Sequence, residues 1–254
     1  MTSKIALVTG ATAGIGRATA IQLAKAGFDM IVCGRRADNL MELSDVLSAM
    51  GIKVIAKVVD VRNKEEVIDF IHSLPLEWQD IDVLVNNAGL AAGLSSFAEG
   101  DLDDWDRMVD TNIKGLLYMS RQVMPHMVKR KSGHIINIGS IAGKEIYPNG
   151  NVYCGTKHAV DALTKSMRRE LAEHKIRVTG IHPGAVETEF SIVRFHGDTD
   201  KAAKVYMGFE NLVADDIAEA IVWCVSRPAH VNINDLVIMP TAQPAAGLII
   251  RDKA

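Results

Sequence analysis

The chain has 254 residues, of which 48% are hydrophobic and 23% charged, as in an average soluble globular protein. A net charge of −3 and the lack of a long apolar run argue against proteins that coat nucleic acids and proteins that span membranes. Three scattered cysteines, Cys33, Cys154 and Cys224, lack metal-ligand spacing, and we expect reduced thiols in a cytoplasmic protein.

Short apolar runs alternate with helical patterns along the chain. The apolar runs predict strands at Ile5–Val8, Met30–Cys33, Val54–Val59, Ile81–Val85, His134–Ile138, Ile176–Ile181 and Leu236–Met239. The spacing of apolar residues predicts helices over 15–26, 37–50, 64–73, 102–130, 152–174 and 215–226. Because the strands are apolar on both faces, we expect a parallel sheet of about seven strands with helices on both faces, a doubly wound Rossmann-type α/β fold.

No linker interrupts this alternation, so residues 1–254 are interpreted as a single domain that binds a dinucleotide and carries out catalysis. The segment 183–212 is the exception, because it is polar and shows no clear periodicity. It follows the sixth predicted strand, at the edge of the sheet where such folds bind ligands. Both a mobile lid on the substrate side and an ordinary surface excursion are compatible with this segment.

A glycine-rich turn joins the first predicted strand to the first helix, where residues 9–16 read T-G-A-T-A-G-I-G. Its glycines allow a sharp turn and a close approach to a pyrophosphate, and the helix N-terminus offers free amide donors. A tight turn with incidental glycines is the alternative. The predicted contacts to a dinucleotide in this turn are Gly10, Thr12, Ala13, Gly14, Ile15 and Gly16.

The end of the second predicted strand distinguishes NADP from NAD. An NAD enzyme places an acid there, on the ribose 2′-hydroxyl, whereas this chain has Arg35 and Arg36. Guanidinium groups match a 2′-phosphate, so we predict NADP, and two solvated arginines are the alternative. Asp38 could serve as the acid, but we interpret it as a helix N-cap.

Later strand ends carry residues that fit the same cofactor. Asp60 and Val61 end the third predicted strand, where the adenine edge would lie. Asn87, Ala88 and Gly89 follow the fourth predicted strand, and the glycine permits a close backbone approach. Each position is weak evidence alone, but their recurrence at carboxyl ends of strands supports a dinucleotide site.

Tyr153 and Lys157 are four residues apart in a predicted helix, so they share one face, and Ser140 ends the fifth predicted strand. An ammonium near a tyrosine lowers the phenol pKa, and a serine can donate a hydrogen bond to a substrate oxygen. A surface helix pair is the alternative for the tyrosine and lysine. The histidines lack metal-ligand spacing, so no metal is expected, and surface or edge positions are predicted for His126, His134, His174 and His182.

Together these motifs resemble the short-chain dehydrogenases/reductases over nearly the whole chain: T-G-x-x-x-G-I-G, N-N-A-G at 86–89, Y-x-x-x-K at 153–157 and P-G at 183–184. The resemblance implies a catalytic core of Ser140, Tyr153 and Lys157. It also implies that Asn112 holds a water linking the lysine to solvent, although the residue by itself suggests a distorted helix. Its further implications are a homotetramer, Lys157 at the nicotinamide ribose, and cofactor contacts from Tyr153, Pro183, Gly184, Val186 and Thr188.

Further segments, including 134–143 and 188–198, are similar to the bacterial NADP-dependent 3-hydroxy acid dehydrogenases. That similarity predicts oxidation of the 3-hydroxyl of L-allo-threonine, L-serine or 3-hydroxyisobutyrate. A carboxylate substrate needs a cation, for which Arg194 is the first candidate and Lys144 the second, while a salt bridge within the loop is the alternative for Arg194. Carbonyl or 3-ketoacyl reduction, and NADP sensing without chemistry, are the alternative functions.

Overall fold

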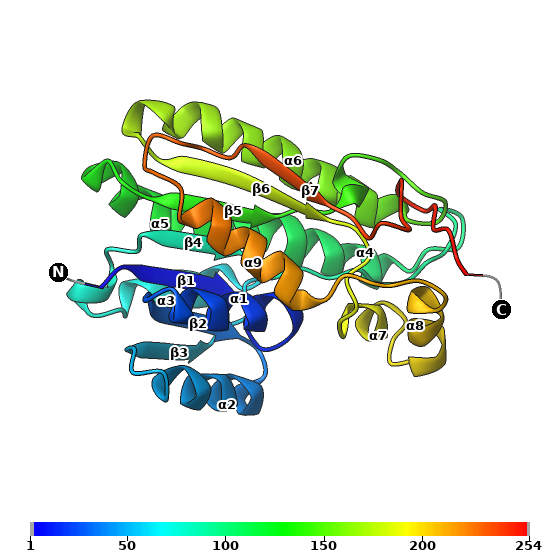
Figure 1. The fold of residues 1–254 in the computed structure, drawn as a ribbon, viewed down its shortest axis with the longest axis horizontal. Coiled ribbons are helices and arrows are strands. Elements are labelled where there is room, and N and C mark those ends of the chain that lie inside the picture. Colours follow the sequence, from blue (N-terminus) through cyan, green and yellow to red (C-terminus); the bar gives the residue numbers. More distant parts are fainter. Residues whose placement is uncertain (1–2, 253–254) are drawn as a thin grey trace.

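The computed structural model describes residues 3–252, and this part of the chain forms a seven-stranded sheet in the order β3-β2-β1-β4-β5-β6-β7 (Figure 1). Every neighbouring pair of strands is parallel. The strands are β1 (Ile5–Thr9), β2 (Asp29–Gly34), β3 (Val54–Val58), β4 (Val83–Asn86), β5 (His134–Ile138), β6 (Arg177–Pro183) and β7 (Asp235–Ile238). The predicted doubly wound sheet is confirmed, and strand ends differ from the prediction by one or two residues.

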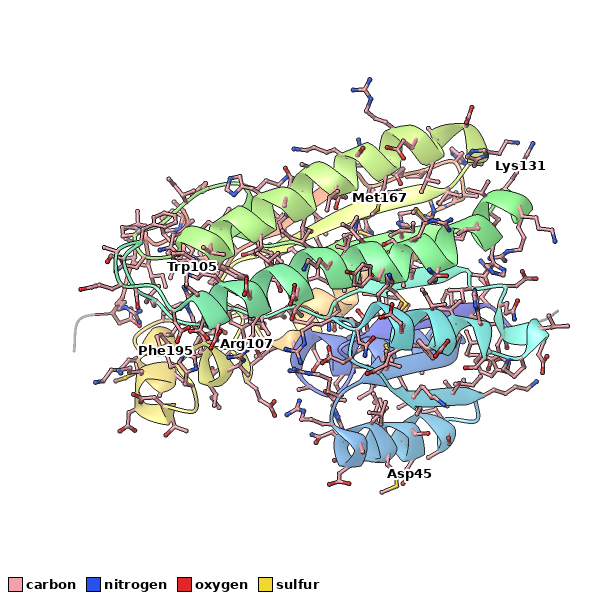
Figure 2. The ribbon with its side chains drawn as sticks, turned by 180° about the vertical axis from the view of Figure 1, so that it is seen from behind. Asp45, Trp105, Arg107, Lys131, Met167 and Phe195 are labelled. Carbon is pink, nitrogen blue, oxygen red and sulfur yellow. The ribbon has the colours of Figure 1, made fainter. Side chains whose placement is uncertain are left out.

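Helices cover both faces of the sheet, as two separate hydrophobic cores show. One face carries α1 (Gly14–Lys25), α2 (Ala37–Ser48) and α9 (Ala214–Val225). The other face carries α3 (Lys64–His72), α5 (Leu116–Arg130) and α6 (Asn151–Leu171), of which α5 and α6 are seen from behind in Figure 2. The central strands β1, β2, β4, β5 and β6 are buried on both sides, which explains why their sequences are continuous apolar runs rather than alternating ones. Short 3₁₀ turns occur at Leu76–Trp78, Ile141–Gly143 and Ala172–His174.

The region predicted as one long helix over 102–130 is helical but not uniform. It consists of α4 (Leu102–Val109), a π-helical stretch at Asp110–Gly115, and α5. The π-helical stretch contains Asn112, so the expected distortion of the helix at this residue is confirmed. Such insertions are rare and are frequently found at functional sites.

The segment 183–212 contains regular structure that its sequence pattern did not predict. Two short helices, α7 (Phe190–Arg194) and α8 (Thr199–Tyr206), lie at the end of the sheet to which the strands point (Figure 1). A β-bridge between Val186 and Leu212 closes the base of this segment. The sequence pattern did not predict α7 and α8, because helices of five and eight residues are too short to show a clear period of apolar residues. We call residues 183–212 the flap.

The structure also tests the expected surface positions of the histidines and the expected lack of a membrane-spanning helix. His134 and His182 are fully buried in the sheet rather than at the surface, so that prediction is wrong for both. Within residues 3–252, no helix combines the length and the apolar character needed to cross a bilayer.

Candidate active site

A cleft of about 510 Å³ opens where the strands end, between the sheet and the flap. This is the edge at which doubly wound sheets bind their ligands. Three of the predicted site residues, Gly16, Asn112 and Lys144, do not line the cleft. The predicted residues that do line it are Gly10, Thr12, Ala13, Gly14, Ile15, Arg35, Arg36, Asp60, Val61, Asn87, Ala88, Gly89, Ser140, Tyr153, Lys157, Pro183, Gly184, Val186, Thr188 and Arg194.

The glycine turn after β1 is held in shape by the loop after β4. The Thr9 hydroxyl accepts hydrogen bonds from the backbone amides of Asn87 and Ala88, both at 3.0 Å. The Asn87 side-chain amide donates to the carbonyl oxygens of Thr9 at 2.9 Å and Gly10 at 3.1 Å. The Asn87 side chain therefore braces the turn from behind, which gives it a structural task that the sequence did not reveal.

Glycine is required in this turn for two different reasons. Gly10 has a φ of +63°, in the left-handed region that other residues rarely adopt. A Cβ at Gly16 would lie 2.4 Å from the Gly10 carbonyl oxygen, so Gly16 packs α1 against the turn instead of facing the cleft. The turn leads into the twelve-residue helix α1, which carries no acidic residue in its first turn and offers free amides to an anion. These features fit the pyrophosphate of a dinucleotide.

Arg36 spans the cleft above this turn. Its guanidinium donates to the Thr12 hydroxyl at 3.4 Å and pairs with the Glu189 carboxylate on the flap at 2.7 Å. Arg35 is exposed on the same rim. Asp38 is not the N-cap of α2 as predicted, since Arg36 occupies that position and Asp38 lies in the first turn, outside the cleft lining. The two arginines are therefore the charged residues that the end of β2 presents to the cleft.

Tyr153 is buried on α6 with its ring edge-on to Phe190 of the flap, 5.7 Å between ring centroids. Burial raises the pKa of its phenol, although the neighbouring Ser140 hydroxyl and Arg194 guanidinium act to lower that pKa. The expected lowering of the Tyr153 pKa by Lys157 is not seen, because Lys157 is not among the groups that act on this phenol, and burial outweighs the groups that lower its pKa. Ser140 itself caps the 3₁₀ turn after β5 by accepting a hydrogen bond from the Ala142 amide at 3.1 Å.

Lys157 lies one turn along α6 and its ammonium is buried. The ammonium donates to the backbone carbonyl of Ile138, at the end of β5, at 2.9 Å. Burial lowers the pKa of Lys157 to about 8, since little water is left to solvate the charge. A Cβ on Gly89 would come within 3.5 Å of this nitrogen, which shows how closely the β4 loop approaches it.

Asn112 acts through the backbone of the β4 loop. Its side-chain oxygen accepts from the Leu90 amide at 2.8 Å, and its nitrogen donates to the Leu90 carbonyl at 2.8 Å and the Thr156 hydroxyl at 3.0 Å. These three bonds join the π-helical stretch, the β4 loop and α6. The side chain is thus engaged with protein groups, and the water-holding role implied by the family remains a prediction.

The two candidate substrate cations have different surroundings. Arg194 lines the cleft, with its guanidinium 5.7 Å from the Tyr153 ring centroid and 5.5 Å from that of Tyr147. One of its terminal nitrogens is buried and has no hydrogen-bond partner. The Lys144 ammonium instead pairs with Asp161 at 2.6 Å, and Lys144 does not line the cleft, so the structure does not bring it to the site.

Sequence reasoning missed several polar or aromatic residues that line the cleft, among them Tyr147, Phe190, Tyr206 and Gln243. Gln243 comes from the chain after β7, and its side-chain oxygen accepts a hydrogen bond from the Ala185 amide at 2.7 Å. The Tyr206 hydroxyl donates to the Val186 carbonyl at 3.0 Å, which ties α8 to the base of the flap. Phe190 lies in the segment 188–198 that carries the resemblance, but Tyr147, Tyr206 and Gln243 lie in none of the motifs, so no local signal identified those three.

Comparison with known proteins places this geometry in context. The sequence profile of the family described as short chain dehydrogenase matches residues 4–198. The chain is 49% identical to the NADP-dependent 3-hydroxy acid dehydrogenase YdfG of Salmonella typhi over 97% of this chain and 98% of that protein. It is 48% identical to the protein of the same name from Escherichia coli (strain K12), covering 96% and 98% of the two chains.

Solved structures show the same similarity. The closed form of serine dehydrogenase complexed with NADP+ superposes with a TM-score of 0.92 and 46% identity, covering 98% of this chain and 100% of that chain. An alcohol dehydrogenase from the archaeon Thermococcus sibiricus, complexed with 5-hydroxy-NADP, gives a TM-score of 0.84 at 27% identity over 95% and 98% of the two chains.

The buried charge of Lys157 generates a prediction about stability and pH. The folded pKa of about 8 lies below the usual 10.5, so the folded protein binds this proton more weakly than the unfolded chain does. The resulting cost, about 3 kcal/mol below pH 8, shrinks as the pH rises towards 10.5. Relative to Lys157→Met, the wild type should gain about 2–3 kcal/mol of unfolding free energy between pH 7 and pH 10, measured by urea denaturation.

Lys165→Met is the matched control, because Lys165 lies on the same helix but is exposed and paired with Asp161. That ion pair raises the pKa of Lys165, so its variant should not show the same increase. A difference between wild type and Lys157→Met that stays constant with pH would contradict the prediction.

Proposed function

The chain belongs to the short-chain dehydrogenase family, and on that premise we propose that its substrates are small 3-hydroxy acids, oxidised with Tyr153 as general acid/base. It is an NADP-dependent oxidoreductase that acts on CH–OH groups, as its relatives indicate. The names of two of them, 3-hydroxy acid dehydrogenase and serine dehydrogenase, support the substrate class. The observation in this chain that carries the proposal is the unpartnered guanidinium nitrogen of Arg194 beside Tyr153.

The residues around Tyr153 account for the proton in the proposed reaction. NADP+, when bound, supplies the acceptor for the hydride that leaves the carbinol carbon. The Tyr153 phenolate oxygen takes the hydroxyl proton, and loss of this proton together with the hydride leaves the 3-oxo acid. The Ser140 hydroxyl donates a hydrogen bond to the substrate oxygen, and the Lys157 ammonium adds positive charge that favours the phenolate.

The raised pKa of Tyr153 makes that added charge necessary. A raised pKa means that little of the tyrosine is phenolate near neutral pH, so the residue needs help to act as a base. A buried cation nearby stabilises the phenolate more strongly than the same cation would in water. Lys157 lies one turn away on the same face of α6, with its ammonium fixed by the Ile138 carbonyl. Below its pKa of about 8 this ammonium is charged, as the mechanism requires.

Arg194 is suited to hold the substrate carboxylate. A guanidinium donates two parallel hydrogen bonds to a carboxylate, and a buried N–H without a partner makes such a ligand favourable. Its other contacts are with the Gly93 carbonyl, at 3.3 Å, and the faces of Tyr147 and Tyr153. Within residues 3–252 the Arg194 guanidinium pairs with no acidic side chain, so the predicted alternative of a salt bridge within the loop has no support.

We assign the cofactor contacts to the predicted residues that line the cleft. We assign the 2′-phosphate to Arg35 and Arg36 and the pyrophosphate to the turn at Gly10–Ile15. Asp60 and Val61 border the adenine side, while Pro183, Gly184, Val186 and Thr188 border the nicotinamide side. Homotetramer formation and a cytoplasmic location remain predictions from the family resemblance and from composition.

A substrate panel with an Arg194 variant tests the substrate class. Arg194→Ala should raise the KM for 3-hydroxy acids at least about tenfold, because charged hydrogen bonds of this kind contribute about 1.5–3 kcal/mol. It should leave the KM for alcohols without a carboxylate unchanged. Arg227→Ala is the control, since Arg227 stacks on Trp223 outside the cleft. An unchanged KM for hydroxy acids, or a wild type that prefers 3-ketoacyl or other carbonyl substrates, would refute the proposal.

A tyrosine variant tests the general acid/base. Tyr153→Phe should lower kcat by about 10²- to 10⁴-fold, because the proton acceptor is lost. The Kd for NADP, measured by fluorescence titration, should change little, since most of the cofactor contacts lie elsewhere in the cleft. Tyr118→Phe, at a tyrosine outside the cleft lining, should keep full activity. Retention of more than a tenth of kcat in Tyr153→Phe would show that another group moves the proton.

An arginine variant tests the choice of cofactor. Arg36→Ala should raise the KM for NADP by about 10- to 100-fold, the effect of losing a charge-assisted hydrogen bond to phosphate. The KM for NAD, which lacks the 2′-phosphate, should stay within about threefold. Arg17→Ala removes an exposed arginine that pairs with Glu42 at 3.0 Å outside the cleft, and serves as control. A parallel rise for both cofactors would contradict the assignment.

A further inference from the structure

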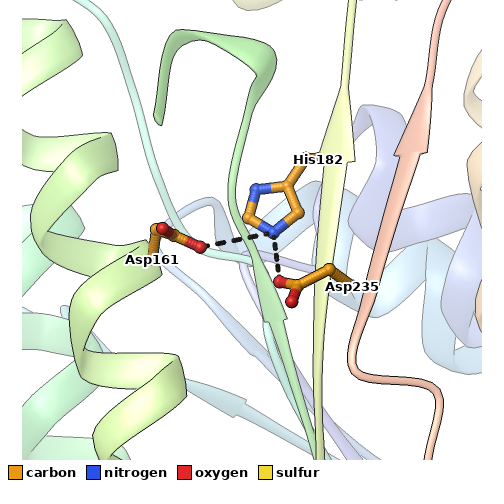
Figure 3. Close-up of side chains that lie close together, drawn as sticks. All are labelled: Asp161, His182 and Asp235. Atoms are coloured by element: carbon orange, nitrogen blue, oxygen red, sulfur yellow. Dashed lines mark hydrogen bonds and ion pairs between the residues drawn. The ribbon is translucent and has the colours of Figure 1, made fainter. Parts of the chain in front are cut away.

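A polar cluster of two buried residues, Asp161 and His182, and the more exposed Asp235 lies behind the site, between α6, β6 and β7 (Figure 3). His182 is fully buried, and its Nε2 lies 3.1 Å from the Asp235 carboxylate and 3.9 Å from that of Asp161. Although these three residues have the composition of a metal site, Lys144 already occupies it, at 2.6 Å from Asp161 and 3.4 Å from Asp235. The cluster therefore has a task other than metal binding.

The imidazole of His182 has a defined orientation. Burial and the charge of Lys144 lower its pKa, although the hydrogen bond to Asp235 acts in the opposite direction. The ring is therefore neutral, and Nε2 carries the hydrogen because it faces the Asp235 carboxylate. Nδ1 is buried without a hydrogen-bond partner. Packing against its surroundings, rather than a second hydrogen bond, fixes that side of the ring.

The His182 ring packs directly against two glycines, Gly139 and Gly180. A Cβ at Gly139 would lie 2.4 Å from Nδ1, and a Cβ at Gly180 would lie 2.6 Å from Nε2. Any other residue at either position would collide with the imidazole. The His182 ring thus lies directly on the backbone at the end of β5. A shift of the ring therefore requires a shift of the backbone at Gly139, and the reverse.

The backbone that the His182 ring contacts belongs to the segment 138–140, which carries groups of the proposed catalytic site. Gly139 stands between Ile138, whose carbonyl accepts the hydrogen bond of the Lys157 ammonium at 2.9 Å, and Ser140. His182 itself directly precedes Pro183 on the nicotinamide side of the cleft. A single buried ring therefore contacts the segment that orients two of the proposed catalytic groups.

The ion pairs around the ring join the same segments. Asp161 follows Lys157 by one turn of α6, and Lys144 follows Ser140 by four residues. The Lys144–Asp161 pair consequently ties the loop after β5 to the catalytic helix, while Asp235 of β7 holds the ring. Side-chain exposures of 24% for Lys144 and 12% for Asp161 show that water screens the pair only in part.

We propose that His182 is a positioning residue, which sets the end of β5 so that the Ile138 carbonyl and the Ser140 hydroxyl meet Lys157 and the substrate oxygen in the reactive geometry. The inference rests on the proposed function, since it assumes that Ser140, Tyr153 and Lys157 act on the substrate. It requires His182 to influence turnover without touching substrate or cofactor.

The first test compares two buried histidines. His182→Ala should lower kcat by about 10- to 100-fold, the cost of a displacement of about 1 Å in a reactive geometry, and leave the Kd for NADP within about twofold. His134→Ala is the matched control, because His134 is equally buried at the opposite end of β5 and bonds Thr179 at 2.8 Å. Both variants should unfold more easily, but only His182→Ala should lose turnover.

A second pair of variants keeps the test informative if His182→Ala does not fold. Gly139→Ala should lower kcat because the new methyl group displaces the ring. The double variant Gly139→Ala/His182→Ala provides space for that methyl group, so its kcat should be no lower than that of Gly139→Ala. His182→Gln keeps an N–H donor for Asp235 and should recover part of the loss seen in His182→Ala.

The outcomes separate this inference from the proposed function. A wild type that oxidises no hydroxy acid with NADP refutes the proposed function. With an active wild type, the inference is overturned if His182→Ala keeps its kcat within twofold, or if His134→Ala loses as much. It is also overturned if the effects of Gly139→Ala and His182→Ala simply multiply in the double variant.

Discussion

A buried ammonium held by one backbone carbonyl is the interaction around which this site is organised. Lys157 donates to the Ile138 carbonyl at 2.9 Å and lies almost without contact with solvent. Burying a cation is costly, and the lowered pKa of Lys157 expresses that cost. An apolar side chain at position 157 would make the folded protein more stable than the buried ammonium does. Retaining a destabilising group is typical of residues that serve chemistry.

The carbonyl that holds this ammonium must itself be held in place. On one side of the sheet the π-helical stretch and the three bonds of Asn112 fix the β4 loop against α6. On the strand itself, the His182 ring rests on Gly139 and is oriented by Asp235. Close backbone approach permitted by glycine thus occurs twice, at the turn for the pyrophosphate and at the end of β5. At the turn the Asn87 side chain holds the backbone of Gly10, and at the end of β5 the His182 ring packs on the backbone of Gly139.

The flap closes the other side of the cleft through contacts that also concern the ligands. Arg36 reaches Glu189 on the flap, and Arg194 of the flap contacts the Gly93 carbonyl on the body of the protein. Arg36 and Arg194, which we assign to the 2′-phosphate and to the substrate carboxylate, are therefore among the residues that join the flap to the rest of the protein. Binding of either ligand would alter an existing contact of the flap, which gives the segment a physical reason to respond to occupancy.

The sequence by itself determined the seven strands and the long helices between them, the glycine turn, and the placement of Tyr153 and Lys157 on one helix face. These features depend on spacing along the chain, on backbone dihedrals and on burial, which local sequence encodes directly. The carboxyl ends of parallel strands meet at one edge, so most of the predicted cofactor residues could also be placed there from sequence.

Only the tertiary structure decided which side chains meet across elements. It moved Lys144 from the substrate pocket to Asp161, buried His182 against Gly139, and brought Gln243 into the cleft. These contacts join residues far apart in the chain through the packing of α6 on the sheet and of the last segment over the strand ends. Sequence spacing carries no information on such distances, because they are fixed by how whole elements pack rather than by any local pattern.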